Sequence, residues 1–166
     1  EERAVTTGDS ATFHTLMKRG ESVAFIPGGF EDATVMLRGR ERTVIQNRKA
    51  FVKYCLEYGY RLHPVWTFGE SDTYHTFGGL QGARVWLNQY KVPTVVFFGN
   101  PLVPFLPLPS SRILTYVGPP LELPHIMQPT NADVEKWHAA YIEALTQMFD
   151  RYKAEAGYPD REIEIL

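Results

Sequence analysis

The residues best suited to chemistry are acids that follow two apolar runs. Glu31 and Asp32 come directly after Pro27-Gly28-Gly29, which ends the apolar run at residues 23–26. Glu70 follows the second run, at residues 65–68, in the same way. Glycine allows a ligand to approach the backbone closely, and open α/β sheets bind ligands at the ends of their strands. The pattern therefore predicts a polar site where these acids meet.

Cations lie between the two acidic stretches. Arg48 and Lys49 begin a predicted helix, where positive charge opposes the helix dipole unless an anion lies nearby. Both signs of charge together indicate a polar substrate pocket. Structural salt bridges that tie turns together explain the same residues equally well, and solvated acids at a plain turn are a third interpretation.

Other catalytic motifs receive little support from the sequence. The five histidines have no metal-ligand spacing, and no serine lies in a Gly-x-Ser-x-Gly elbow. Neither a Gly-x-Gly-x-x-Gly nor a Walker sequence is present, so no nucleotide cofactor and no metal site are expected. His138 falls on an apolar helical stripe and is expected to be a core histidine.

Alternating strand and helix patterns predict the elements that would position the acids. Strands are expected at residues 23–26, 43–45, 61–68, 93–98 and 112–117, the fourth of them buried. Helices are expected from Ser10 to Gly20, from Arg48 to Gly59, over residues 80–90, and from a Thr130–Asp133 capping box onward. Residues 38–42 are predicted to be a charged surface arm. This alternation is typical of an α/β fold with a mostly parallel sheet and helices on both faces, forming a single domain over residues 1–166.

The segment at residues 100–111 is different in character. Pro101, Pro104, Pro107 and Pro109 stand among large apolar residues, which excludes an interior helix or a central strand. An apolar loop of this kind must pack on its own domain or meet a membrane or a partner. We expect contact with a lipid surface.

Composition excludes several classes of protein. The chain has 166 residues, a formal charge of −2 and a single cysteine, Cys55. Disorder, a disulfide framework and a general affinity for nucleic acid are therefore not expected. No apolar run approaches the roughly 18 residues needed to span a bilayer.

Four stretches of the chain resemble the type 2 diacylglycerol acyltransferase family, which includes monoacylglycerol and wax-ester acyltransferases. The resemblance extends over nearly the whole chain and includes the order of residues in the C-terminal helix. The stretches are Pro27-Gly28-Gly29-Phe30-Glu31-Asp32, Asn47-Arg48-Lys49-Ala50-Phe51-Val52-Lys53, Pro64-Val65-Trp66-Thr67-Phe68-Gly69-Glu70 with Tyr74, and Val117-Gly118-Pro119-Pro120-Leu121.

The resemblance implies transfer of a fatty acyl group from acyl-coenzyme A to a glycerolipid hydroxyl, with diacylglycerol conversion to triacylglycerol favoured. It places the activity on the cytosolic face of the endoplasmic reticulum membrane or at a lipid droplet. The family's general base is thought to belong to a His-Pro-His-Gly motif, and this chain lacks that motif. The chain is therefore expected to be the C-terminal portion of a longer acyltransferase and to be inactive alone. A non-catalytic domain that binds lipid or acyl-coenzyme A is the alternative.

By the same resemblance, two groups of residues are expected to serve the substrates. The acceptor side comprises Gly28, Gly29, Glu31, Asp32 and Glu70, and the cationic support comprises Arg48, Lys49 and Lys53. Asp32 stands where the family usually has Glu, and Ala50 replaces the usual Gly. A neutral glycerolipid needs no cation, so Arg48 is expected to brace the Pro-Gly-Gly turn. The acyl length, the acceptor and the oligomeric state do not follow from the sequence.

Overall fold

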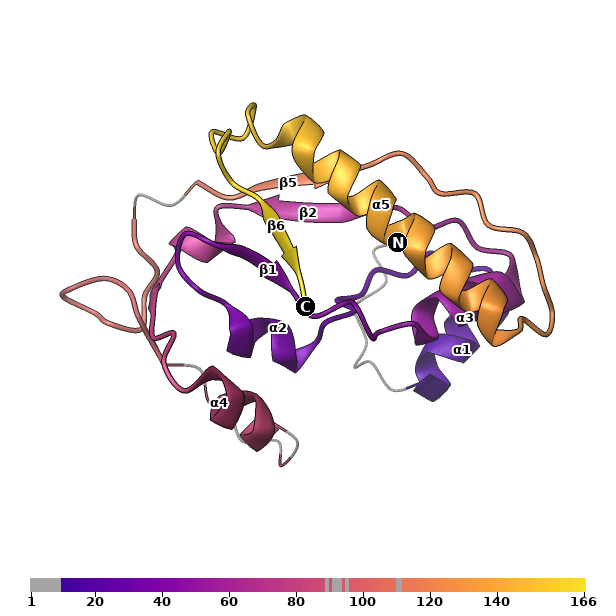
Figure 1. Cartoon of the computed structure of the whole chain (residues 1–166), viewed down its shortest axis with the longest axis horizontal. Helices are drawn as coiled ribbons and strands as arrows, with labels where there is room; N and C mark the ends of the chain where they lie inside the picture. The colour runs from indigo at the N-terminus through magenta and orange to yellow at the C-terminus, as the bar shows by residue number, and fades with distance from the viewer. Residues whose placement is uncertain (1–9, 89, 91–93, 95, 110–111) are drawn as a thin grey trace.

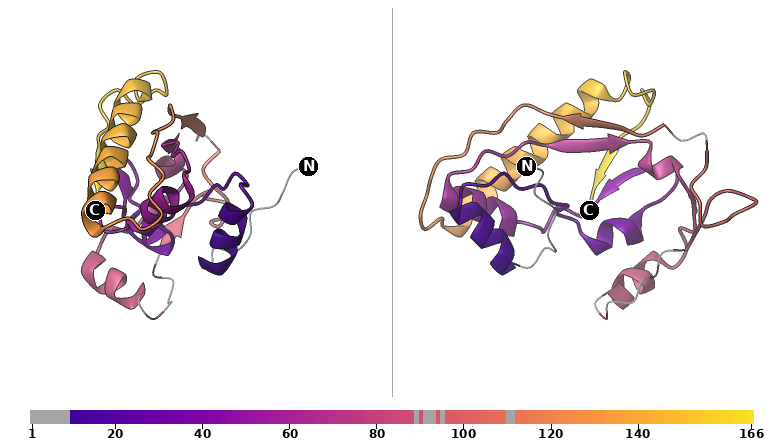
Figure 2. Two further views of the ribbon diagram at one scale, coloured as in Figure 1. Left: turned by 90° about the vertical axis from the view of Figure 1, so that its right-hand side faces the viewer. Right: turned by 180° about the vertical axis from the view of Figure 1, so that it is seen from behind.

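The computed structural model describes residues 10–88, 90, 94, 96–109 and 112–166. The long helix α5 (Asn131–Tyr152) runs along one side of the strands (Figure 1). Helices α1 (Ser10–Lys18) and α3 (Ala50–Tyr58) lie at one end of the long axis. Helix α4 (Gln81–Asn88) and the irregular segment 100–109 lie at the other end, in the front view and from behind (Figures 1 and 2).

Within the described ranges, the strands form three separate pairs. β1 (Glu41–Thr43) is parallel to β6 (Ile163–Ile165), with Arg42 opposite Glu164. β2 (Val65–Phe68) is antiparallel to β5 (Leu114–Val117), and β3 (His75–Thr76) is antiparallel to β4 (Phe97–Phe98).

The mixture of helices and strands is confirmed, but the expected mostly parallel sheet is not seen among the described residues. One of the three strand pairs is parallel. The alternation of apolar runs with helices indicates the class of a fold, but it does not say which strand edges meet. Here β2 pairs with a strand about fifty residues later along the chain.

The helices α3 and α5 supply most of the core, as their spacing predicts. α3 buries Phe51, Val52, Cys55 and Leu56, and Gly59 ends it in a left-handed conformation with φ of 69°. The predicted stripe of α5 is buried at six positions: Val134, His138, Tyr141, Leu145, Met148 and Phe149. The predicted capping box of Thr130 and Asp133 is present. The strongly periodic part of the sequence therefore folds as expected.

Two strand predictions are wrong. Residues 21–26 form no strand, and the side chains of Phe25 and Ile26 are 40% and 76% exposed. The strand expected at residues 93–98 is reduced to Phe97–Phe98, which is exposed rather than buried, while residues 93 and 95 lie outside the described part. An apolar run becomes a strand only where a partner edge is available to pair with it.

The strand expected at residues 43–45 is shifted to Glu41–Thr43, and the other predictions are largely confirmed. α4 (Gln81–Asn88) falls within the expected residues 80–90, and β5 (Leu114–Val117) within residues 112–117. Residues 100–109 contain neither helix nor strand, as their prolines require, and residues 110–111 lie outside the described part. None of the described helices combines the length and the apolarity needed to cross a bilayer.

Two short helices hold the acids of the candidate site. α2 (Phe30–Val35) begins directly after the Pro-Gly-Gly turn and contains Glu31 and Asp32 in its first turn. A 3-10 helix, Glu70–Asp72, follows β2. The acids therefore sit at helix starts, where negative charge is favourable.

Candidate functional site

A groove of about 450 Å³ lies between α2, β1 and β2. Its walls combine large apolar side chains with acids, hydroxyls and arginines. The apolar lining includes Phe25, Ile26, Met36, Ile45, Val65, Trp66, Tyr141 and Leu145. The polar lining includes Asp32, Arg40, Glu41, Arg42, Thr43, Glu70 and Ser71. Such a lining suits a ligand with a hydrocarbon part and a few polar atoms.

The structure brings Asp32 and Glu70 to the same groove, as the sequence predicts. The backbone segments that precede the two acids differ. Glu70 follows a strand, β2, as expected, whereas Asp32 follows an irregular segment instead of a strand end. Gly29 also lines the groove.

The carboxylate of Asp32 is occupied by the end of β1. It accepts a hydrogen bond from the backbone N–H of Val44 at 2.6 Å and one from Thr43 Oγ1 at 3.2 Å. Burial raises the pKa of Asp32 above its ordinary value, while these two hydrogen bonds and the nearby Arg48 oppose the rise. Asp32 thus fastens α2 to β1. Its carboxylate has little hydrogen-bonding capacity left for a ligand.

The two positions before α2 require glycine for different structural reasons. A Cβ at Gly28 would lie 2.0 Å from the carboxyl carbon of Asp32, so a side chain there would displace that carboxylate. Gly29 is the N-cap of α2 and has φ of 58°, a left-handed conformation that side chains disfavour. Gly28 therefore lies behind Asp32, away from the groove lining.

The predicted cations are not gathered at the groove. Arg48 pairs with Glu31 at 2.9 Å, Lys49 with Glu135 of α5 at 3.4 Å, and Lys53 with Glu57 one turn along α3 at 3.7 Å. None of the three is among the residues that line the groove. The Arg48–Glu31 pair agrees with the bracing expected of Arg48, because it joins the start of α3 to the Pro-Gly-Gly turn.

Glu70 is the exposed acid of the groove. Gly69 before it has φ of 88°, and a Cβ there would lie 2.0 Å from the carbonyl oxygen of Arg112. The backbone carbonyl of Glu70 accepts a hydrogen bond from Thr73 Oγ1 at 2.6 Å. The turn is fixed while the side chain faces solvent, so this carboxylate is well placed to accept a hydrogen bond from a ligand hydroxyl.

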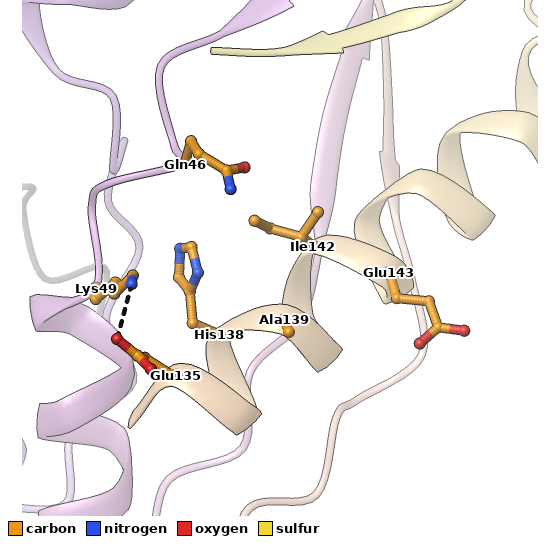
Figure 3. Close-up of a pocket in the computed structure, with 7 residues that line it drawn as sticks. All are labelled: Gln46, Lys49, Glu135, His138, Ala139, Ile142 and Glu143. Carbon is orange, nitrogen blue, oxygen red and sulfur yellow. Dashed lines mark hydrogen bonds and ion pairs between the residues drawn. The ribbon is translucent and has the colours of Figure 1, made fainter. Parts of the chain in front are cut away.

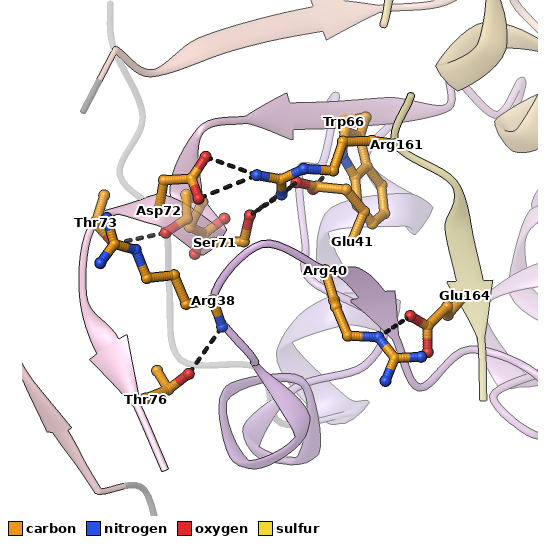
Figure 4. Close-up of polar contacts among 11 residues, drawn as sticks. Arg38, Arg40, Glu41, Trp66, Ser71, Asp72, Thr73, Thr76, Arg161 and Glu164 are labelled. Carbon is orange, nitrogen blue, oxygen red and sulfur yellow. Dashed lines mark hydrogen bonds and ion pairs between the residues drawn. The ribbon is translucent and has the colours of Figure 1, made fainter. Parts of the chain in front are cut away.

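A buried polar cluster beside the groove was missed by the sequence analysis (Figure 4). Glu41 is only 2% exposed, and its carboxylate accepts from Trp66 Nε1 at 3.2 Å, from Ser71 Oγ at 2.8 Å and from Arg161 at 3.0 Å. Arg161 also binds Asp72 through two contacts of 3.1 Å. Residues 38–42 were predicted to be a surface arm, which is wrong for Glu41.

One pattern in the sequence could have predicted that Glu41 is buried. Glu41, Thr43 and Ile45 alternate along an extended segment, and all three are buried, so Glu41 shares the face of an obvious core residue. Nothing local in the sequence points to Arg161, which lies 120 residues later.

A second depression, of about 540 Å³, lies beside α5 (Figure 3). Its lining includes Gln46, Lys49, Glu135 and His138. His138 is 3% exposed and donates from Nε2 to the carbonyl of Ile45 at 3.0 Å, and burial lowers its pKa. His138 is thus a core histidine, as predicted. No cluster of three or more metal-binding side chains occurs within the described ranges.

Comparison with known proteins identifies the family. Residues 7–166 match the diacylglycerol acyltransferase family, which accounts for nearly the whole chain. This chain belongs to that family. No solved structure matches it.

Relatives of this diacylglycerol acyltransferase family member differ in their named acceptors. Diacylglycerol O-acyltransferase 2 of Xenopus laevis is 33% identical in an alignment 157 residues long that covers 86% of this chain and 42% of the relative. The human protein of that name is 28% identical over 158 residues, covering 87% and 40%. Human acyl-CoA wax alcohol acyltransferase 2 is 33% identical over 157 residues, covering 89% and 47%. The chain therefore spans less than half the length of these relatives.

Proposed function

We propose that this chain is the C-terminal portion of an O-acyltransferase that transfers a fatty acyl group from acyl-coenzyme A to a glycerolipid hydroxyl. Diacylglycerol is the proposed acceptor, and triacylglycerol the product. The observation that supports the proposal is the groove, in which Glu70 and Asp32 face a largely apolar lining in a member of the diacylglycerol acyltransferase family.

The groove residues suggest separate roles for the two acids. Asp32 already accepts from Val44 and Thr43, so its role is to hold α2 against β1 and shape the groove. Glu70 is exposed and is the proposed acceptor of a hydrogen bond from the glycerolipid hydroxyl. A neutral acceptor also agrees with the arginines of the groove, since Arg40 and Arg42 are both paired with Glu164.

The proton of the attacking hydroxyl must be removed by a base, because an alcohol is a weak nucleophile at its own pKa. The His-Pro-His-Gly motif is absent from these 166 residues, so no catalytic residue is assigned within them. We propose that the base belongs to an upstream part of the enzyme and that this chain alone is inactive. Lys49 and Lys53 are proposed as cationic support, and Arg48 is proposed to brace the Pro-Gly-Gly turn through Glu31.

The wider setting of the enzyme is part of the proposal. The upstream part would join the three short strand pairs in a glycerolipid-acyltransferase-like α/β fold. The enzyme would act on the cytosolic face of the endoplasmic reticulum membrane or at a lipid droplet. The relatives that are named diacylglycerol O-acyltransferases support this assignment.

The second candidate is a non-catalytic domain that binds lipid or acyl-coenzyme A. The observation that favours it is a groove suited to an amphipathic ligand in a chain without the base motif. Under this alternative the extended protein would bind the substrates without turnover.

The decisive experiment measures transfer of labelled oleoyl-coenzyme A to diolein by this chain and by a protein extended upstream through a His-Pro-His-Gly motif. Activity is expected in the extended protein alone. Glu70→Gln in that protein is expected to raise the KM for diolein about fivefold, because the amide oxygen still accepts the hydrogen bond but lacks the charge that makes it about twice as strong. Glu122→Gln is the control, because Glu122 is exposed and pairs with Arg61 outside the groove.

Two results would overturn the proposal. Binding of diolein and acyl-coenzyme A without turnover in the extended protein would support the non-catalytic alternative. An unchanged KM in the Glu70→Gln protein would remove Glu70 from the acceptor site.

A further inference from the structure

A buried tyrosine of α5 lines the groove and carries a hydroxyl group. Tyr141 is 7% exposed and belongs to the apolar stripe of the helix. Its ring meets the ring of Phe51 edge-on, with centroids 5.2 Å apart. Leu145, one turn later on the same face of α5, lines the groove as well. The core therefore holds the ring of Tyr141 in place, and this part of α5 contributes to the wall of the groove.

The hydroxyl of Tyr141 has no hydrogen-bond partner among the residues that the structure describes. Within those residues, every fully buried side-chain nitrogen or oxygen does have a partner. The hydroxyl of Tyr141 must therefore lie in the small part of the side chain that remains exposed. Of the two depressions described above, Tyr141 lines the groove and not the one beside α5. Its hydroxyl thus opens to the groove.

The other neutral side-chain donors of the described groove lining are already engaged. Each forms a hydrogen bond inside the protein: Trp66 and Ser71 donate to Glu41, Thr43 donates to Asp32, and Thr67 shares a hydrogen bond with Thr115. The two arginines of the lining are both paired with Glu164. Within this lining, Tyr141 is therefore the neutral donor that remains available to a ligand.

The chemistry of this hydroxyl indicates what it can bind. Burial raises the pKa of Tyr141 to about 12, with a smaller contribution from Cys55. The hydroxyl therefore keeps its proton at physiological pH and can donate it to an uncharged acceptor. A single donor in a largely apolar lining suits a carbonyl oxygen on a hydrocarbon chain, because the chain occupies the apolar part while the oxygen accepts the hydrogen bond.

We propose that the Tyr141 hydroxyl donates a hydrogen bond to the carbonyl oxygen of a fatty acyl ester held in the groove. The identity of this carbonyl rests on the proposed function, in which diacylglycerol carries two esters and acyl-coenzyme A carries a thioester. The contact complements that of Glu70, which accepts from the free hydroxyl. If the carbonyl belongs to diacylglycerol, the two residues together favour an acylglycerol over a long-chain alcohol, which has a hydroxyl but no carbonyl.

Paired ligands with and without the carbonyl test this contact in the protein extended upstream. Binding of dioctanoylglycerol is compared with that of its ether analogue dioctylglycerol, and binding of oleoyl-coenzyme A with that of its thioether analogue. The carbonyl compound of one pair is expected to bind about fivefold more tightly, the usual size of one neutral hydrogen bond. Tyr141→Phe is expected to abolish this preference and to leave binding of the analogue without a carbonyl unchanged. The pair that responds identifies the source of the carbonyl.

Tyr54→Phe is the matched control, because Tyr54 also packs on the core but does not line the groove. Its preference for the carbonyl compound is expected to equal that of the unaltered protein. The Tm of Tyr141→Phe is not expected to fall, since its hydroxyl has no partner in the described part of the chain to lose.

Three results would overturn the proposal. They are no preference for either carbonyl compound in the unaltered protein, a preference that persists in Tyr141→Phe, and an equal loss in Tyr54→Phe. Binding is measured without acyl transfer, so the two proposals fail separately. A Tyr141-dependent preference without turnover would contradict the proposed activity alone, whereas turnover without such a preference would contradict this contact alone.

Discussion

At the scale of single residues, the two acids of the groove have different environments. Asp32 is partly buried and holds the N–H of Val44, whereas Glu70 is exposed on a fixed turn. The sequence placed both acids in one site because each follows an apolar run and a glycine. It could not separate their roles, because the partners of Asp32 come from a strand eleven and twelve residues later.

Substitution of Asp32 tests its structural role. Asp32→Ala leaves the N–H of Val44 without its acceptor, so we expect a loss of about 1–3 kcal/mol in the free energy of unfolding at neutral pH. Asp32→Asn keeps an oxygen for that N–H and removes the buried charge, so its stability is expected to equal or exceed that of the unaltered chain. Urea unfolding followed by circular dichroism measures both variants.

The pH dependence of these variants follows from the raised pKa of Asp32. The folded chain holds the proton of this carboxyl more tightly than the unfolded chain does. The contribution of Asp32 to stability is therefore largest below its ordinary pKa and falls as pH rises through the raised value. Asp32→Asn should gain on the unaltered chain as pH rises through this window. A difference that does not change with pH would contradict the assignment of burial as the main cause.

At the scale of elements, regular spacing predicted the four longer α-helices, missed the short α2, and failed for two of the five expected strands. The stripes of α3 and α5 identify a buried face without reference to any other part of the chain. A strand needs a partner edge, and the partners here are distant: β6 pairs with β1 across about 120 residues. The apolar run at residues 23–26 finds no such edge, and the short Ile163–Ile165 strand was not expected at all.

The groove could be predicted from the sequence only in part, because residues that meet from distant parts of the chain leave no local signal. Asp32 and Glu70 were found because each belongs to a local motif. Glu41 and Arg161 were missed because a buried ion pair shows in the sequence only as two ordinary charges. The predicted cations Arg48, Lys49 and Lys53 were placed in the site, but each has an acid partner outside the groove lining.

The capping box of α5 allows an element to be tested alone. Thr130 Oγ1 accepts from the N–H of Asp133 at 3.2 Å, and the Asp133 carboxylate accepts from the N–H of Thr130 at 2.9 Å. Thr130→Ala is expected to lower the free energy of unfolding by about 1 kcal/mol. Thr146→Ala in the same helix is the control, because Thr146 donates to the carbonyl of Ile142 one turn earlier and is expected to change stability by less than about 0.5 kcal/mol.

The cap also carries a pH signature. Hydrogen bonds from Thr130 lower the pKa of Asp133 below its ordinary value. This contribution is present above the ordinary pKa of the carboxyl and is lost as pH falls through the lowered value. The stability difference between the unaltered chain and Thr130→Ala should therefore shrink in acid. If the stability difference between the two proteins is the same at neutral and acidic pH, the capping box does not stabilise the helix through the Asp133 carboxylate.

At the scale of the whole molecule, Arg161 joins the C-terminal segment to the groove. It contacts Glu41 in β1, and it contacts Ser71 and Asp72 in the 3-10 helix that begins with Glu70. Its guanidinium also lies 5.0 Å from the centroid of the Tyr158 ring. One side chain thus fixes the relative positions of β1, the turn that carries Glu70 and the last strand.

Removal of Arg161 is expected to be far more costly than removal of a surface cation. Arg161→Ala leaves the carboxylate of Glu41, which is 2% exposed, without its positive partner, and this should lower the free energy of unfolding by about 3–5 kcal/mol. Adding Glu41→Gln removes the unpaired charge and should restore part of that loss. Arg19→Ala is the control, because Arg19 is 64% exposed and lies 3.9 Å from Glu21, so about 0–1 kcal/mol is expected. Urea unfolding of the unaltered chain and the three variants measures these free energies. If Arg161→Ala loses no more stability than Arg19→Ala, Glu41 is hydrated. If the double variant is no more stable than Arg161→Ala, Asp72 is the important partner of Arg161.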